Sequence, residues 1–263
     1  AMSQMRPLPR KQSGSGSVSS SSTGAEVPSL KVVVVGDYGV GKTSLIRQLT
    51  QRQFLANSGT TIGVEFKEQR FPNAVLQIWD IAGQQYMSSM TKQYYRWASA
   101  AIVCVDITKD STFDVALDWR RDVLEKVGGP VTNSASASPV RGGADISGAK
   151  PQTPSDGECA IPIFLFVNKS DLMSQTSRTP ESLQLFALEH GFTDMMLTSA
   201  KDYQNVCNAF QHVATFVVET QDALGADTSR SGAGSSAINL NALRRSMRPT
   251  NGSRADGEKK CCN

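Results

Sequence analysis

The residues with the clearest chemical potential form the segment GDYGVGKT at 36–43. Its spacing, GxxxxGK followed by Ser or Thr, is typical of loops that hold phosphates. Glycines let backbone N–H groups turn toward phosphate oxygens, and the N-terminus of a following helix adds positive potential. In such a loop Lys42 bridges the β- and γ-phosphates and Thr43 ligates Mg²⁺. We expect phosphate contacts from Gly39, Val40, Gly41, Lys42, Thr43 and Ser44.

A second pair of motifs favours a guanine base. NKSD at 168–171 follows the apolar run 161–167, and SAK at 199–201 ends a later apolar run. The Asp171 carboxylate can accept two hydrogen bonds from guanine N1 and N2, whereas adenine lacks this pair of donors. The Ala200 N–H would donate to guanine O6. Either motif alone could be a polar turn, but their order after a phosphate loop disfavours an ATP-using kinase. The predicted base-binding residues are Asn168, Lys169, Asp171, Ser199, Ala200 and Lys201.

The segment DIAGQ at 80–84 reads as DxxGQ and predicts hydrolysis of the terminal phosphate. Asp80 would hold Mg²⁺ through water, the Gly83 N–H would sense the γ-phosphate, and Gln84 would orient the attacking water, with Lys42 as the second catalytic residue. Thr61 lies in a polar loop and is either a second hydroxyl ligand of Mg²⁺ or a turn residue. The sequence therefore predicts a nucleotide, Mg²⁺ and a bound water at one site.

The elements that must position these residues follow from apolar periodicity. Continuous runs such as VVVV and IFLFV predict strands buried on both faces, hence a mainly parallel sheet covered by helices. The run at 63–71 alternates, which indicates an antiparallel edge pair with 75–81. We predict a three-layer α/β fold with six strands and five helices, and with ligand chemistry at the carboxyl ends of the strands. The predicted strands are 30–35, 63–71, 75–81, 100–107, 161–167 and 195–199, and the predicted helices 42–52, 85–97, 112–127, 179–190 and 203–224.

Composition divides the 263 residues into one folded domain and three soft segments. The domain would cover 29–224, interrupted by a disordered insertion at 128–160 that is rich in Gly, Pro and Ser. A Ser-rich extension at 1–28 and a flexible tail at 225–263 would flank it. No apolar run is long enough to cross a bilayer as a helix, and no signal-peptide stretch is present, so we expect a cytosolic protein.

Charge and cysteine placement bear on the partners. The net charge is +3, but the excess basic residues lie in the two tails rather than on the folded body, which argues against a nucleic-acid partner. Five cysteines match neither a disulfide framework nor a zinc pattern. We expect Cys104 and Cys207 to pack in the core. Cys261 and Cys262 are adjacent in a predicted tail, where they have no packing role.

With these motifs in place, the sequence resembles the Ras superfamily and, within it, the Rab family. TIGVEF at 61–66 is similar to the Rab TIGVDF, and LQIWD at 76–80 and YYR at 94–96 match Rab segments. The stretch 106–123, together with Ile81, looks most like the Rab subgroup that serves lysosome-related organelles. The resemblance covers nearly the whole predicted domain.

The resemblance implies a P-loop GTPase fold and a GTP/GDP switch with Mg²⁺ and slow hydrolysis, which recruits effectors for vesicle trafficking. The alternative is a GTP-loaded scaffold with negligible hydrolysis; an intact Gln84 favours the switch. The Rab resemblance also implies three kinds of partner: an exchange factor, a GTPase-activating protein and an escort or GDI-type chaperone. It further implies that the chain is a monomer on the cytoplasmic face of an endomembrane, endosomal or lysosome-related, and that it cycles with the cytosol. Phe66, Trp79 and Tyr94 would face effectors, although all three could instead be core. Phe54 would stack on guanine or pack under its loop.

Several residues depart from the Rab pattern. QYM at 85–87 replaces ERF, Trp97 replaces Gly, and Tyr38 stands where Ras has Gly and many Rabs have Ser. We expect the Tyr38 ring to slow intrinsic hydrolysis and to restrict which activating proteins fit, because it borders the space of the γ-phosphate and the attacking water. In the alternative the ring swings outward and leaves the rate unchanged.

The ending Cys261-Cys262-Asn263 resembles the Rab double-cysteine motif, which implies a geranylgeranyl group on each cysteine. Two chains and nearby basic residues bind a membrane stably, whereas one chain binds reversibly. Deleting 261–263 should therefore make the protein cytosolic and leave nucleotide binding intact, as judged by fractionation and nucleotide titration. Persistent membrane association of the truncated chain would place the anchor elsewhere.

Overall fold

The computed structural model describes residues 27–56, 59–85, 91–127 and 161–228. Within them, six strands form one sheet in the order β2-β3-β1-β4-β5-β6. β2 pairs with β3 in antiparallel fashion, and the other four pairings are parallel. The predicted sheet, including its antiparallel edge, is confirmed. The strands are β1 (Ser29–Gly36), β2 (Val64–Arg70), β3 (Val75–Ile81), β4 (Ala100–Asp106), β5 (Ile163–Asn168) and β6 (Asp194–Leu197).

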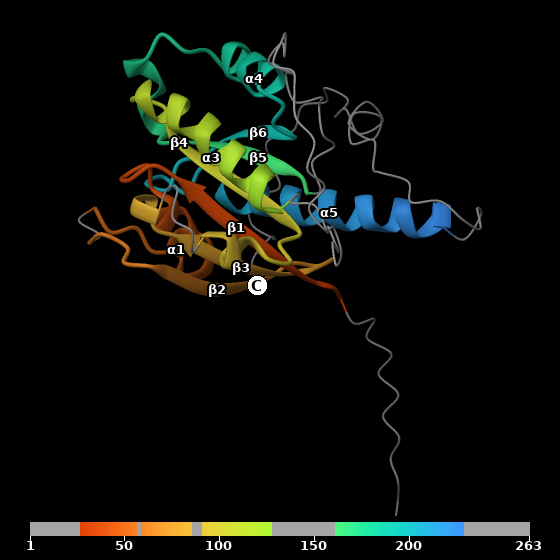
Figure 1. Cartoon of the computed structure of the whole chain (residues 1–263). Helices are drawn as coiled ribbons and strands as arrows, with labels where there is room; N and C mark the ends of the chain where they lie inside the picture. The colour runs from red at the N-terminus through yellow and green to blue at the C-terminus, as the bar shows by residue number, and fades with distance from the viewer. Residues whose placement is uncertain (1–26, 57–58, 86–90, 128–160, 229–263) are drawn as a thin grey trace, which may run out of the picture.

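Helices cover both faces of this sheet, as Figure 1 shows with α3 in front of the strands and α5 reaching beyond the edge of the sheet. Alternate residues of β1 enter two separate cores. Val32 and Val34 pack with residues of α1 and α5, while Val33 and Val35 pack with residues of α2, α3 and α4. The α-helices are α1 (Lys42–Gln51), α2 (Thr91–Tyr95), α3 (Ser111–Val127), α4 (Pro180–Glu189) and α5 (Val206–Thr228).

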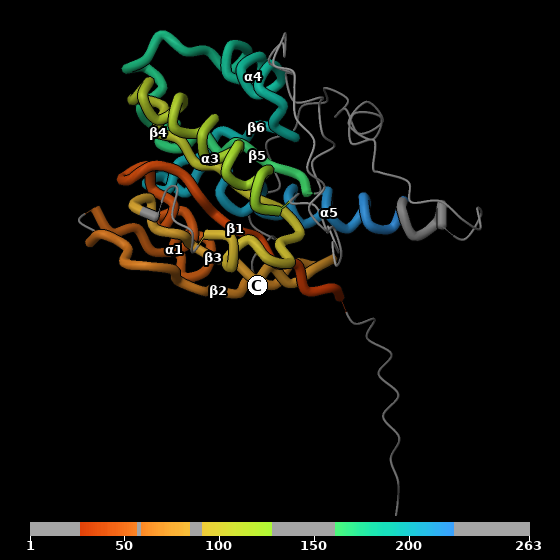
Figure 2. Tube along the Cα trace, in the orientation of Figure 1, coloured from red at the N-terminus to blue at the C-terminus, as the bar shows by residue number. Residues whose placement is uncertain are grey.

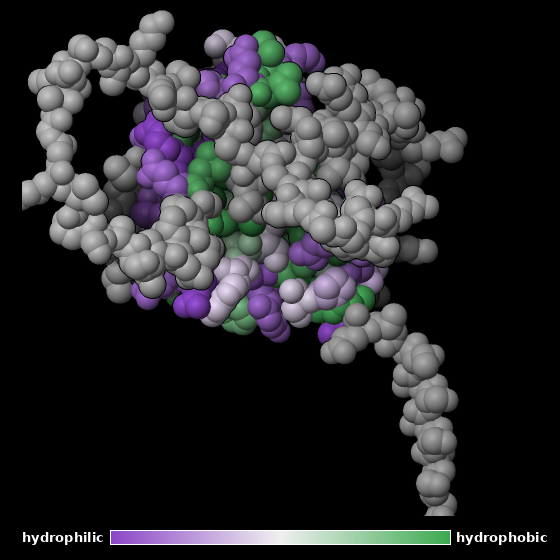
Figure 3. All heavy atoms as spheres, turned by 45° about the vertical axis from the view of Figure 1, so that its right-hand side comes forward, coloured by the Kyte–Doolittle hydropathy of each residue, from purple (hydrophilic) through white to green (hydrophobic). Residues whose placement is uncertain are grey.

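The strands with continuous apolar sequences are buried on both faces, as the sequence predicted. Every residue of β4 and of β5 is buried. Cys104 on β4 and Cys207 on α5 are also buried in the core, which confirms their predicted packing role. Within the described residues, no helix combines the length with the hydrophobicity that crossing a bilayer requires. On the face drawn in Figure 3, the described surface mixes hydrophilic and hydrophobic residues.

Two helices differ from their predicted ranges. The predicted helix 85–97 is a short 3₁₀ turn at Gly83–Gln85 and the five-residue α2, with 86–90 outside the described residues. The predicted helix 203–224 begins only at Val206, because Tyr203 and Asn205 have left-handed φ values of 60° and 55° that a right-handed helix cannot contain. It then continues to Thr228.

The chain path explains why the chemical motifs meet. In Figure 2 the trace runs from β1 in the middle of the sheet to β2 and β3 on one side, then to β4, β5 and β6 on the other. The phosphate-loop segment begins at the last residue of β1, DIAGQ overlaps the end of β3, NKSD begins at the last residue of β5, and SAK follows β6. Since the carboxyl ends of parallel strands lie at one edge, these motifs converge there. The predicted insertion and most of both predicted tails, with Cys261 and Cys262, lie outside the described residues.

Candidate nucleotide site

The loop between β1 and α1 approaches neighbouring backbone and side chains very closely. A Cβ at Gly36 would lie 2.3 Å from the Cys104 carbonyl oxygen, and one at Gly41 would lie 2.3 Å from Asn168 Nδ2. Gly41 has a φ of 99° and precedes the first residue of α1. Only glycine tolerates both the left-handed backbone and the contact, so the loop can place its N–H groups around a ligand.

Lys42 is a buried cation at the centre of this loop. The residue is only 6% exposed, and its ammonium donates to the carbonyls of Gly36 and Asp37 at 2.8 and 2.9 Å. Burial lowers the pKa of Lys42, partly offset by the nearby Asp80 and Asp37 carboxylates. Within the described part of the chain it forms no salt bridge, so an anionic ligand such as a phosphate fits this position.

Beside Lys42, three side-chain oxygens converge. The Thr43 hydroxyl donates to Asp80 Oδ2 at 2.5 Å and lies 2.6 Å from the Thr61 hydroxyl. Asp80 is buried, and its Oδ1 has no hydrogen-bond partner among the described residues. Burial raises the pKa of Asp80. A carboxylate and two hydroxyls are hard oxygen ligands, so the set fits Mg²⁺ held directly or through water.

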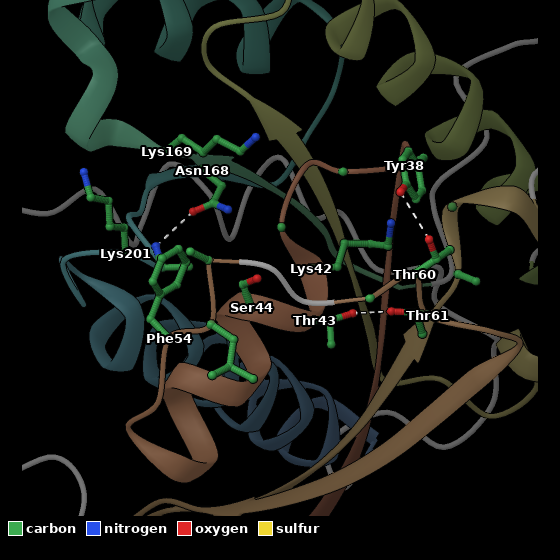
Figure 4. Close-up of a pocket in the computed structure, with 18 of the residues that line it drawn as sticks. Tyr38, Lys42, Thr43, Ser44, Phe54, Thr60, Thr61, Asn168, Lys169 and Lys201 are labelled. Atoms are coloured by element: carbon green, nitrogen blue, oxygen red, sulfur yellow. Dashed lines mark hydrogen bonds between the residues drawn. The ribbon is translucent and has the colours of Figure 1, made fainter.

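The opposite end of the pocket carries the predicted base-binding residues. Ser199 Oγ donates to Asp171 Oδ1 at 2.6 Å, and Lys201 Nζ lies 3.8 Å from the other carboxylate oxygen. The Asp171 side chain is only 8% exposed. In Figure 4, Phe54 and Lys201 lie at this end, away from Tyr38 and Thr60. The carboxylate is thus oriented from one side and faces the pocket with its remaining acceptor capacity.

Asn168 joins the two ends. Its Nδ2 donates to the Val40 carbonyl at 2.8 Å, and its Oδ1 accepts from the Ala200 N–H at 3.2 Å. The Ala200 N–H, predicted to donate to guanine O6, therefore already has a long hydrogen bond in this structure. The Ala200 carbonyl accepts from Gln48 Nε2 on α1 at 2.7 Å. These bonds fix the phosphate loop and the SAK turn relative to each other.

Lys169, which also lines the pocket, forms an ion pair with a residue that the sequence did not single out. Its ammonium donates to Asp106 at 2.6 Å, at the end of β4. Burial would raise the pKa of Asp106, but hydrogen bonds from Lys169 and Thr108 outweigh it and hold that pKa below its usual value. Sequence reasoning missed Asp106, although a charged residue ending a fully buried strand is a usable signal. It also missed Gln48, for which periodicity offers no signal.

Most of the predicted site residues line one pocket of about 420 Å³. Val40 and Ser199 are buried behind its wall, and Asp80 borders an adjoining cavity of about 160 Å³. Phe66, Trp79 and Tyr94 do not line it. The predicted residues that do are Gly39, Gly41, Lys42, Thr43, Ser44, Phe54, Thr61, Gly83, Gln84, Asn168, Lys169, Asp171, Ala200 and Lys201.

The Tyr38 ring stands at the mouth of this pocket. It is 58% exposed, and its hydroxyl lies 3.1 Å from the Thr60 hydroxyl. The backbone of Tyr38 also touches the DIAGQ segment, because a Cβ at Gly83 would lie 2.6 Å from the Tyr38 nitrogen. The ring therefore lines the pocket but is more than half exposed to solvent. An effect of this ring on hydrolysis remains a prediction.

A six-stranded sheet with a glycine loop around a buried lysine, and with a pocket at the carboxyl ends of its strands, defines a Ras-like P-loop GTPase fold. The family model "Ras family" matches residues 31–135. Over 73% of this chain and 77% of its own length, "Ras-related protein Rab-32" of Mus musculus is 34% identical. The Homo sapiens Rab-32 is 36% identical over 72% and 73%, and "Ras-related protein Rab-7L1" of Rattus norvegicus is 35% identical over 69% and 78%. The chain therefore belongs to the Rab proteins of the Ras family.

The bridge formed by Asn168 generates a prediction for nucleotide affinity. Replacing Asn168 with Ala leaves the Val40 carbonyl and the Ala200 N–H unpaired and loosens both ends of the pocket. We expect about 10- to 100-fold weaker binding of fluorescent GDP, measured by titration. Asn73→Ala is the matched control, since its amide also bonds another element, Thr215 at 3.1 Å, but lies away from the pocket. Wild-type affinity in Asn168→Ala would contradict this role.

Proposed function

We propose that this Rab-family chain is a GTP/GDP switch in membrane traffic, with the pocket at the strand ends as its nucleotide site. One observation carries the proposal: a single pocket has a buried cation, Lys42, at one end and a nearly buried carboxylate, Asp171, at the other. The first suits phosphates and the second suits the edge of guanine. Asn168 holds the two ends in a fixed relation.

Base selection follows from the buried state of Asp171. Guanine N1 and N2 present two donors to a carboxylate, whereas adenine would leave it unpaired at a cost of about 1–3 kcal/mol. Ser199, which donates to one oxygen, orients the group before the base arrives. Phe54 and Lys201 flank the same end and supply flat or aliphatic surface for the ring. A guanine nucleotide is thus the ligand that this pocket fits best.

Hydrolysis would take place at the other end. Thr43, Thr61 and Asp80 would hold Mg²⁺, which neutralises charge on the phosphate oxygens when bound. Lys42 would stabilise charge that develops on the γ-phosphate. Gln84 lines the pocket, is exposed, and would orient the attacking water through its amide. Positioning alone gives a slow reaction, because the described site contains no arginine among its lining residues to stabilise the transition state.

Gln84 also separates the switch from its alternative, a scaffold that stays loaded with GTP. A scaffold would need no water-orienting group at this place, and a glutamine side chain that borders the phosphate end favours the switch. The proposed cycle would be completed by an exchange factor, a GTPase-activating protein and a GDI-type escort.

The effector surface is proposed at the β2–β3 edge. Phe66 is 48% exposed and packs edge-on against Trp79, with ring centroids 5.7 Å apart. Trp79 and Tyr94 are partly buried against the core, so Phe66 would make the most direct contact. Ile62 and Trp97 are 91% and 78% exposed. Large exposed apolar side chains beside a nucleotide-sensing loop suit a partner site.

The membrane role rests on resemblance and relatives. Rab-32 and Rab-7L1 proteins align over most of this chain, and the sequence resembles the subgroup that serves lysosome-related organelles. We propose peripheral attachment to the cytoplasmic face of such an endomembrane through lipid groups on Cys261 and Cys262. These two residues lie outside the described residues, and the truncation given above tests the attachment.

The test of the proposed function compares three nucleotides on one protein. The wild type should bind fluorescent GTP much more tightly than fluorescent ATP, and Mg²⁺ should strengthen that binding. Asp171→Asn should bind GTP about 10- to 100-fold more weakly and should gain affinity for xanthosine triphosphate, whose base offers an acceptor to the amide. Asp202→Asn, an exposed residue three positions beyond Ser199, is the matched control and should keep the wild-type preference.

Two results would refute the assignment. One is equal affinity of the wild type for GTP and ATP, which would remove the guanine site. The other is undiminished GTP affinity in Asp171→Asn, which would show that this carboxylate does not recognise the base. Single-turnover hydrolysis by the wild type and by Gln84→Leu then distinguishes a switch from a scaffold, since only a switch loses activity.

A further inference from the structure

Tyr38 links the phosphate loop to the segment that carries Thr61. Its side chain leaves the loop between β1 and α1, and its hydroxyl meets Thr60 Oγ1 at 3.1 Å. Figure 4 shows the two side chains facing each other on the phosphate side of the pocket, close to Lys42. Both residues line the pocket. The contact therefore joins two parts of the chain that are 22 residues apart.

The next residue makes a second contact of the same kind. Thr61 Oγ1 lies 2.6 Å from Thr43 Oγ1, at the start of α1. Tyr38 lies in the loop before α1 and Thr43 lies within α1, so the two contacts come from different parts of the chain. Thr60 and Thr61 are thus held in two directions, one by Tyr38 and the other by Thr43, and two such bonds fix the orientation of the peptide between them.

Among the described residues, few other hydrogen bonds hold this segment. Ile62 is 91% exposed, and Thr60 and Gly59 are exposed as well. The backbone is next secured where the Ala82 N–H donates to the Gly63 carbonyl at 3.0 Å. In the described part of the chain, the side-chain hydrogen bonds of residues 59–62 are those of Thr60 and Thr61. The hydrogen bond from the Tyr38 hydroxyl is therefore one of the two side-chain bonds that orient this segment in the described structure.

We propose that Tyr38 is a positioning residue for the Mg²⁺ site: by bonding Thr60, it holds the Thr61 hydroxyl toward Thr43 and thereby slows release of a bound nucleoside triphosphate. The proposal rests on the nucleotide site proposed above. It assigns a role to the hydroxyl of Tyr38, separate from any steric effect of its ring. A serine or glycine at position 38 could not span the distance to Thr60.

The expected change in the rate of nucleotide release follows from the kind of hydrogen bond that is lost. A neutral, partly exposed hydrogen bond contributes modestly, so losing it should speed release of the triphosphate about two- to fivefold. The effect should depend on Mg²⁺, because the bond acts through a ligand of the metal. When the metal is removed, Thr61 has no ion to hold, and release should be fast and equal with or without the Tyr38 hydroxyl.

The experiment measures release of a fluorescent, non-hydrolysable GTP analogue from the full-length chain, in excess Mg²⁺ and in excess EDTA. Tyr38→Phe removes only the hydroxyl, and Thr60→Val removes its partner while keeping the shape. Both should release the analogue two- to fivefold faster in Mg²⁺, and the double variant should be no faster than either. Thr60→Ser keeps a hydroxyl and is the matched control, so it should behave as the wild type.

Three outcomes would overturn the proposal. Wild-type release from Tyr38→Phe in Mg²⁺ would show that the hydroxyl has no such role. Equal acceleration in Mg²⁺ and in EDTA would show that Tyr38 supports the segment without acting through the metal. Additive effects in the double variant would show that Tyr38 and Thr60 act separately. Failure of the wild type to bind the analogue at all would instead refute the proposed nucleotide site.

Discussion

The structure depends on a buried positive charge, that of Lys42, which forms no salt bridge with any of the described residues. The ammonium of Lys42 is removed from water and rests on the carbonyls of Gly36 and Asp37. Carbonyl dipoles compensate only part of the cost of burying a charge, and that cost lowers the pKa of the group. A phosphate group would compensate for the rest. We therefore expect ligand binding and stability of the fold to be coupled at this one side chain.

The surrounding sheet keeps that charge in place. Gly36 lies so close to the Cys104 carbonyl on β4 that a side chain at this position would collide with it. Burial raises the pKa of the Cys104 thiol to about 12, so this cysteine acts as a packed, neutral neighbour of the loop. Asn168 then ties the loop to the base end of the pocket. In the proposed site, a fixed distance between Lys42 and Asp171 would favour a whole nucleotide over a phosphate or a base alone.

Much of this arrangement could be predicted from the sequence, since apolar runs mark buried strands and the GxxxxGKT spacing has a defined backbone geometry. The edge pair of strands was predictable from the alternation at 63–71. The delayed start of α5 was not, because left-handed φ values at Tyr203 and Asn205 have no apolar signal. Contacts between distant segments were also inaccessible: the pairing of Lys169 with Asp106, and of Tyr38 with Thr60, emerges only when strand ends meet.

If this account is correct, the charge of Lys42 destabilises the nucleotide-free fold and stabilises the nucleotide-bound fold. Replacing Lys42 with Met keeps the aliphatic stem and removes the charge, so the most direct measurement is thermal unfolding of the wild type and Lys42→Met, each stripped of nucleotide and each saturated with GDP and Mg²⁺. A ligand that binds only the folded state raises its unfolding temperature, and at a fixed ligand concentration the shift grows with the logarithm of the affinity. We predict a crossover: Lys42→Met unfolds at a higher temperature than the wild type without nucleotide, and at a lower temperature with it. If Lys42→Met is less stable by the same amount in both states, the lysine is a structural residue and the account is contradicted.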